Sequence, residues 1–188
     1  MKITTFIGSS RENGNTEILT DIVTKNIQHN KIYLRDLNIK PIHDLRHDVN
    51  GFQPVDDDYD QIIKALLESD LLIFSTPVYW YTMSGLMKNM VDRISQAIRD
   101  ARYPQLRGQL KSKNAIVVTV GGDDPYIKGL PLIQQFKYTF DFLNMNFPAY
   151  IIGEGHRPGD ISQDKQAIAY AELLNEKLKE VTVTGTFK

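Results

Sequence analysis

The amino-acid sequence predicts an α/β fold: a doubly wound sheet of five parallel strands with helices on both faces. Five apolar stretches rich in β-branched and aromatic residues alternate with stretches whose apolar residues recur at helical spacing. This alternation is typical of βαβ units, whose right-handed crossovers leave few topologies. With 188 residues and no internal repeat or low-complexity linker, the chain is expected to form one domain over residues 1–188.

The first elements follow from runs of apolar residues. Ile3–Ile7 is expected to form a buried strand, and helical spacing begins at Thr16. A short second strand is expected at Ile32–Leu34. The next stretch, Arg35–Pro54, is expected to be irregular, and loops of that length are often functional or mobile.

The middle of the chain shows a second helix, a third strand and a third helix. Helical spacing returns at Tyr59, and the acidic run Asp56–Asp58 before it is expected to cap that helix rather than bind a metal. Leu71–Ser75 is expected to be a buried strand that Pro77 breaks. A long amphipathic helix is expected over Leu86–Ile98.

The last part of the chain repeats the alternation. Ala115–Val120 is expected to form the fourth strand, ended by Gly121 and Gly122. A helical stripe from Ile133, a fifth strand at Phe147–Ile152 and a final helix from Ala167 complete the pattern.

Composition excludes several classes of protein. The chain has no Cys, which excludes a disulfide framework, a thiolate metal site, an iron–sulfur cluster and a cysteine nucleophile. Its net charge of −1 lacks the basic excess of a nucleic-acid-binding protein. The apolar N-terminal stretch is too short for a signal peptide, and no run approaches the roughly 18 residues that span a bilayer. We therefore expect a cytoplasmic protein without nucleic-acid or membrane partners.

Ligands of such sheets bind beyond the carboxyl ends of the strands, at the switch point. The first loop there, residues 8–16, joins a strand to the start of a helix, where free N–H groups and the helix dipole attract anions. Ser9, Asn15 and Thr16 add polar groups, and Arg11 adds a fixed positive charge. The glycine spacing matches neither the P-loop nor the G-x-G-x-x-G motif. The alternative is a plain turn with Asn15 or Thr16 as the N-cap.

Two further loops follow strand ends. Tyr79, Trp80 and Tyr81 are consecutive aromatic residues, and they cannot all point into one core. A flat heteroaromatic ring would stack on them, although interface or core packing alone is the alternative. Gly121 and Gly122 allow a close backbone approach, and Asp123 would accept a hydrogen bond from such a ring.

Together these loops resemble those of flavodoxin-like flavoproteins, in the branch of NAD(P)H-dependent FMN reductases and quinone reductases. The matching stretches are GSSRENGNT after the first strand and STPVYWYTMSGLMKNMVDR after the third. The resemblance implies bound FMN, reduction by NADH or NADPH, hydride transfer to a small acceptor, and a homodimer. It implies cofactor-binding roles for Ser9, Arg11, Gly14, Asn15, Thr16, Pro77, Val78, Tyr79, Trp80, Tyr81, Gly121, Gly122 and Asp123.

Several alternatives stay open at this point. An electron-carrying flavodoxin would bind FMN without substrate turnover, but such carriers tend to be strongly acidic. A scaffold protein that had lost the cofactor is a second alternative. The acceptor could be a quinone, an azo or nitro compound, or free flavin. His43 and His47 are expected to be solvated, and Lys88, Asp92 and Arg93 are expected to form contacts on a helix surface. No catalytic residue is assigned. Tyr103, Tyr126 or His156 could line the substrate side of the site.

Overall fold

A computed structural model describes residues 1–185 of the chain. Five parallel strands form one sheet in the order β2-β1-β3-β4-β5, which confirms the predicted doubly wound architecture. The strands are β1 (Ile3–Ile7), β2 (Asn30–Tyr33), β3 (Leu71–Pro77), β4 (Asn114–Gly121) and β5 (Asn146–Glu154). The chain order reverses between β1 and β3, so their carboxyl ends define the switch point.

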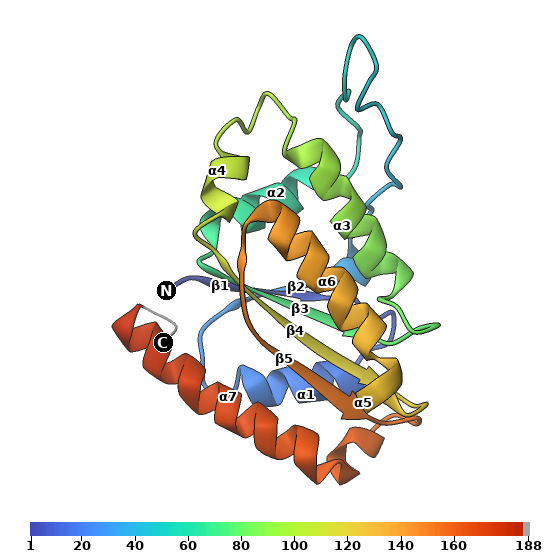
Figure 1. Cartoon of the computed structure of the whole chain (residues 1–188), viewed down its shortest axis with the longest axis vertical. Helices are drawn as coiled ribbons and strands as arrows, with labels where there is room; N and C mark the ends of the chain where they lie inside the picture. Colours follow the sequence, from blue (N-terminus) through green and yellow to red (C-terminus); the bar gives the residue numbers. More distant parts are fainter. Residues whose placement is uncertain (186–188) are drawn as a thin grey trace.

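Helices cover both faces of the sheet (Figure 1). One face packs against α1 (Asn15–Val23) and α7 (Lys165–Thr184), and the apolar residues between them form a separate core. The other face packs against α2 (Tyr59–Glu68), α3 (Gly85–Ala97), α4 (Leu106–Leu110) and α6 (Leu130–Leu143). Phe6 contacts Phe74 within the sheet, and Phe74 contacts Phe136 and Phe140 of α6, with ring centroids 5.1–5.7 Å apart. Two dry cores therefore fix the sheet, and the loops at its carboxyl edge stay free for a ligand.

Several predicted boundaries were wrong by a few residues. β2 starts two residues earlier than expected, and Leu34 begins the 3-10 turn η1 (Leu34–Asp36) instead of ending the strand. β3 continues to Pro77, which pairs in register with Val120, so this proline does not break it. At the last strand position a proline lacks only its own N–H, and Val78 N–H continues the ladder to Val120 O at 2.9 Å.

The expected cap of α2 is confirmed in part, because Asp57 Oδ1 accepts the N–H of Tyr59, the first residue of the helix, at 3.1 Å. Asp58 is the N-cap residue, but its side chain accepts no hydrogen bond from the helix backbone. Its carboxylate instead accepts Asn38 N–H at 2.7 Å, and that of Asp57 accepts Lys40 N–H at 3.0 Å. The two carboxylates thus bond backbone N–H groups at residues 38 and 40, which belong to no strand and, within residues 1–185, have no sheet partner.

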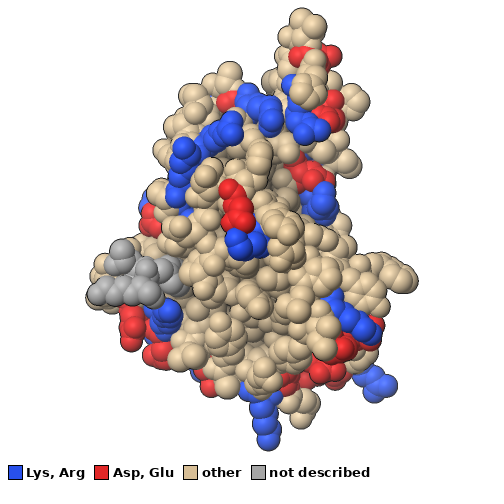
Figure 2. Space-filling model, in the orientation of Figure 1, with Lys and Arg blue, Asp and Glu red and all other residues tan. Residues whose placement is uncertain are grey.

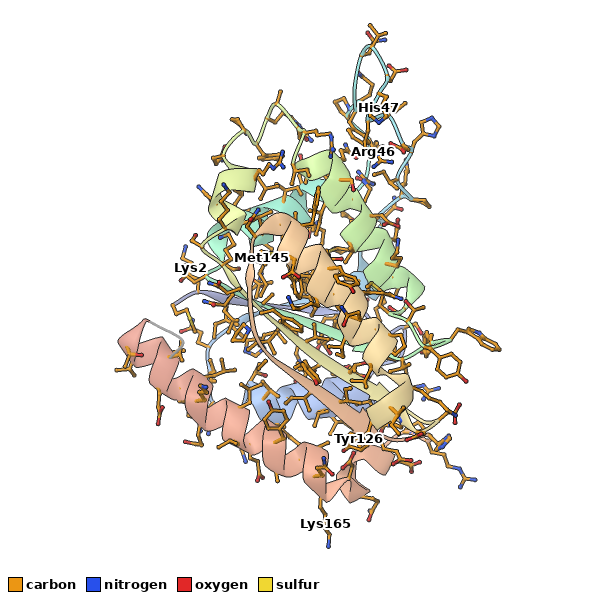
Figure 3. All side chains as sticks on the ribbon, in the orientation of Figure 1. Lys2, Arg46, His47, Tyr126, Met145 and Lys165 are labelled. Carbon is orange, nitrogen blue, oxygen red and sulfur yellow. The ribbon has the colours of Figure 1, made fainter. Side chains whose placement is uncertain are left out.

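The long segment between η1 and α2 projects from the body of the molecule, and Arg46 and His47 lie near its tip (Figures 1 and 3). Its base is fastened to α3, where Arg93 forms a buried ion pair with Asp57 and donates to Lys40 O at 2.8 Å. The expected (i, i+4) contact on this helix is confirmed for Lys88 and Asp92, 2.6 Å apart. Arg93 belongs to the buried pair instead.

Candidate functional site

The first loop is anchored to the sheet and to α3 at its start. Gly8 N–H donates to Ser75 O at 2.7 Å, which extends the β1–β3 ladder by one residue. The Ser84 hydroxyl donates to Gly8 O at 2.6 Å and accepts Met87 N–H at the start of α3. The Ser9 hydroxyl then donates to Arg11 O at 2.7 Å, which closes the loop. The loop is therefore shaped before any ligand arrives.

The start of α1 has no side-chain cap. Gly14 is the N-cap residue, so the alternative of a plain turn capped by Asn15 or Thr16 does not hold. Within residues 1–185, the backbone N–H groups of Gly14, Asn15 and Thr16 have no hydrogen-bond acceptor. Exposed Arg11 stands in the same loop. Unpaired N–H groups at a helix start, beside a guanidinium, form an electropositive site for an anion.

The second loop is a tight turn in an unusual conformation. Tyr79 and Thr82 exchange backbone hydrogen bonds of 2.9 and 3.1 Å across Trp80 and Tyr81. Both central residues have positive φ, +49° and +63°. Non-glycine residues rarely adopt this region. In this turn 91% of the Trp80 surface is exposed.

The third loop closes against the second. The Tyr81 hydroxyl donates to Asp123 Oδ2 at 2.9 Å, and Lys128 Nζ of α5 (Pro125–Lys128) donates to Asp123 Oδ1 at 2.6 Å. Hydrogen bonds from Lys128 and Tyr81 lower the pKa of the Asp123 carboxyl, and the same bond to Asp123 raises the pKa of Tyr81. Asp123 is therefore a carboxylate that already has two partners.

These loops surround two adjoining hollows at the carboxyl edge of the sheet. The first has a volume of about 210 Å³ and the second about 150 Å³. Together they reach the lower end of the range typical of small-molecule sites, roughly 300–1,000 Å³. The first is lined by Ser9, Arg11, Gly14, Asn15, Thr16, Pro77, Val78, Tyr79, Val120, Gly121, Gly122, Gly155 and His156. The second is lined by Val78, Trp80, Tyr81, Gly121, Gly122, Asp123 and Pro125.

All thirteen residues of the predicted site thus line one hollow or the other. The sequence analysis did not include Gly155, and it named His156 only as a possible substrate-side residue. Both follow the fifth strand, in the stretch Gly155–Gly159, and a glycine-bounded loop after a strand was the available signal.

Two aromatic candidates lie elsewhere. The Tyr126 hydroxyl donates to Asp164 Oδ2 at 2.7 Å, at the start of α7 (Figure 3), and burial together with this bond raises the pKa of Tyr126. Tyr103 packs against the core under the Arg102 guanidinium, 5.2 Å from its ring centroid, and lines neither hollow. Both residues have structural contacts that account for them.

A larger groove, of about 1,060 Å³, runs along the edge strand β2 beside α2. Its lining mixes Lys2, Lys31 and Lys64 with Asp36 and Glu68, and it contains none of the strand-end loops. We favour the two smaller hollows because ligands of doubly wound sheets bind at the switch point.

The fold and the strand-end loops define an α/β protein with N–H groups unpaired among the described residues, an exposed arginine and two adjoining hollows at its switch point. A family model described as NADPH-dependent FMN reductase matches residues 1–155. The chain belongs to this family, so it is an NAD(P)H-dependent FMN oxidoreductase, and the electron-carrier alternative is not supported. Within residues 1–185, no helix is both long and apolar enough to cross a membrane.

Three relatives are similar to this chain over most of its length. YwqN of Bacillus subtilis, provisionally named an NAD(P)H-dependent FMN-containing oxidoreductase, is 49% identical over 93% of this chain and 96% of its own length. An iron–sulfur flavoprotein of Methanocaldococcus jannaschii is 30% identical over 96% of this chain and 97% of its own. The solved structure of Trp repressor binding protein from Bacillus subtilis has a TM-score of 0.78 and 42% identity, and covers 92% of this chain and 97% of that one.

Proposed function

We propose that the two adjoining hollows hold FMN, with its phosphate at the first loop and its ring beside the second and third loops. The observation that carries this proposal is the uncapped start of α1 with Arg11 beside it, opening into a hollow bordered by Gly121 and Gly122. A phosphate dianion would satisfy N–H groups that have no acceptor within residues 1–185. A flat ring would reach the backbone at the two glycines, beside Val78 and His156, whose side chains pack against them.

The residues of this chain bind, orient and shield, and the redox chemistry is that of the cofactor. Bound FMN supplies hydride acceptance from NAD(P)H and electron donation to an acceptor. Tyr79 and Val78 would border the ring from the second loop, and the Tyr81–Asp123 hydrogen bond would hold the second and third loops together at its edge. The exposed Trp80 leaves a large aromatic surface beside the hollow for a second flat molecule.

Arg11→Ala tests the phosphate assignment. One charge-assisted hydrogen bond contributes about 1.5–3 kcal/mol, so FMN should bind roughly 10- to 150-fold more weakly. Riboflavin, which lacks the phosphate, should bind nearly as it does to the wild type. Arg46→Ala, an exposed arginine on the projecting segment, is the matched control and should change neither affinity. Equal weakening of both ligands by Arg11→Ala would contradict the assignment.

We further propose quinones or azo compounds as the acceptors. An FMN-dependent NADPH-azoreductase of Staphylococcus aureus is 34% identical over 50% of this chain, and an FMN-dependent NADH:quinone oxidoreductase of Vibrio parahaemolyticus is 28% identical over 78%. Anaerobic stopped-flow reduction with NADH and with NADPH, followed by mixing with quinone, azo, nitro and flavin acceptors, identifies the pair used. Reoxidation by free flavin alone would overturn the acceptor proposal.

We propose a homodimer that uses the outer face of α6. Tyr138 and Phe142 of α6 are 66% and 61% exposed, and they line a groove of about 330 Å³ against Val91, Ile94 and Ile98. The face seen in Figure 2 is largely uncharged but carries a group of acidic and basic side chains, and α6 holds the exposed Lys137–Asp141 ion pair. Exposed apolar surface of this kind marks an interaction site.

A reductase of this kind would work in the cytoplasm, where NAD(P)H is supplied.

Light scattering tests the dimer. The wild type should have the mass of a dimer at micromolar concentration, and Phe142→Glu should yield monomers, because the charge would be buried in the interface. Leu173→Glu is the control: Leu173 is 65% exposed on α7, on the opposite side of the sheet, and its substitution should leave the dimer intact. A monomeric wild type would refute the proposal.

A further inference from the structure

The side chain of Asn15 is turned away from the first loop. Its Nδ2 donates to Arg157 O at 2.8 Å, and its Oδ1 accepts Gly159 N–H at 2.8 Å and Ile161 N–H at 3.4 Å. Both lone pairs of the amide oxygen are therefore used, by backbone about 145 residues further along the chain. The residue fastens the first loop to the loop after β5.

The two loops fit closely where Asn15 joins them. A Cβ atom at Gly155 would lie 2.6 Å from Asn15 Nδ2, so the close approach requires glycine there. Gly155 N–H also donates to Gly121 O at 2.9 Å, which continues the β4–β5 ladder. The loop after β5 is thus fixed from two sides, by α1 and by β4.

His156 is the side chain that this loop presents to the site. A Cβ atom at Gly122 would lie 2.6 Å from His156 Nδ1 and 2.9 Å from Cε1, so the imidazole packs directly against the Gly122 backbone. The ring lines the first hollow together with Arg11 and Ser9. The residue is exposed, and within residues 1–185 no hydrogen bond to either nitrogen of its ring is found. Both nitrogens are therefore open to solvent or to a ligand in that hollow.

We propose that the loop after β5 is a fourth wall of the cofactor site, with His156 as a cofactor-binding residue and Asn15 as the positioning residue that holds this wall. The inference rests on the proposed FMN site, and it changes the role of Asn15 within that site. The amide of Asn15 serves the Arg157–Ile161 backbone, and only the main-chain N–H of this residue remains for the phosphate.

The two possible roles of Asn15 predict different effects on FMN affinity relative to riboflavin affinity. A residue that binds the phosphate, as Arg11 is expected to, contributes to FMN binding alone. A residue that positions His156 contributes to the binding of FMN and riboflavin alike. We expect Asn15→Ala to weaken both flavins by a similar factor, roughly threefold to tenfold for one neutral hydrogen bond. His156→Ala should do the same. Because Asn15→Ala already displaces His156, the double variant should lose less than the product of the two factors.

Gly122→Ala tests the position of His156 while leaving Asn15 unchanged. The added methyl group would clash with the imidazole, so both flavins should again bind more weakly. Gly108→Ala on α4 is the matched control, since a Cβ atom there meets nothing within 4 Å and both affinities should be unchanged. His156→Gln keeps an N–H donor and should restore part of the affinity that His156→Ala loses.

Fluorescence titration of apoprotein with FMN and with riboflavin gives all these ratios. If Asn15→Ala weakens FMN alone, as Arg11→Ala is expected to, the positioning role is overturned and the proposed FMN site stands. If Asn15→Ala, Gly122→Ala and His156→Ala leave both affinities unchanged, the fourth wall is overturned. If the wild type binds neither flavin, the proposed site itself fails. Should Asn15→Ala not fold, Gly122→Ala and His156→Ala decide the matter.

Discussion

The buried ion pair between Arg93 and Asp57 gives the sharpest prediction about stability. Arg93 is 2% exposed and the Asp57 side chain 0%, and their closest nitrogen and oxygen atoms are 2.5 Å apart. Arg93 also donates to Gln96 Oε1 at 3.0 Å and lies over the Tyr59 ring, 4.7 Å from its centroid. Arg93→Met would leave a carboxylate buried without its cation. Breaking such a pair costs about 3–5 kcal/mol, which for a chain of this length lowers the Tm by about 6–20 °C.

The effect should depend on pH with a defined sign. Burial raises the pKa of Asp57, but hydrogen bonds from Arg93, Lys40 N–H and Tyr59 N–H outweigh it and hold the pKa below its usual range. The carboxylate thus stabilises the fold fully above its unfolded pKa of about 3.9, and that contribution is lost as the pH falls through the lower folded value. The difference in unfolding free energy between wild type and Arg93→Met should therefore be smaller at pH 3 than at pH 7, because the unpaired Asp57 of the variant takes up a proton as the pH falls.

Urea unfolding at pH 7 and at pH 3 measures both effects. Lys88→Met, on the same helix, is the matched control, because the Lys88–Asp92 pair is exposed and should contribute less than about 1 kcal/mol. Adding Asp57→Leu to Arg93→Met should recover part of the loss, since no unpaired charge then remains. A loss below about 1 kcal/mol for Arg93→Met, or one equal to that of Lys88→Met, would refute the reasoning.

Three further predictions concern the site and its surroundings. Replacing Trp80 by Asn and Tyr81 by Gly should stabilise the apoprotein by about 1–2 kcal/mol in thermal unfolding, because these residues accept positive φ, and should slow reduction by NAD(P)H in stopped flow. Tyr126→Phe should cost about 0.5–1.5 kcal/mol through its lost bond to Asp164, and flavin titration should show FMN affinity unchanged. Removing FMN held at 100 times its Kd should cost about 2.7 kcal/mol, a calorimetric Tm decrease of about 5–11 °C.

The fold was predictable because the spacing of apolar residues indicates which side chains are buried. The buried side chains in turn distinguish the strands of the sheet from the helices on its faces. β3 and β4 are buried along most of their length, and a continuous apolar run indicates such strands directly. The short helices α4 and α5 were missed because a single turn has no apolar period to detect. The other partners of Asp57 and Asp58 were missed because they are set by tertiary contacts with α3 and residues 38–40.

The site was predictable for a different reason, and only in part. The switch-point rule selects strand ends from the order of elements, and the family resemblance then selects thirteen residues there, all of which line the two hollows. Side-chain direction does not follow from that rule. Asn15 lies in the first loop by sequence, but its amide bonds to backbone near Arg157, a contact between segments far apart in the chain. Local sequence therefore locates a residue at a site without specifying which of its groups serves the ligand.

The turn at Trp80 and Tyr81 has backbone strain that other residues would avoid. Each left-handed residue without glycine costs roughly 1–2 kcal/mol, and an Asn-Gly pair would form the same turn without that cost. The bond from Tyr81 to Asp123 recovers only part of it, since an exposed hydrogen bond contributes little. Trp80 recovers none through burial, because 91% of its surface remains exposed. The stability of the unbound protein would thus favour other residues at these two positions. We infer that the aromatic side chains contact a ligand or a second subunit, and that this contact offsets the strain on binding.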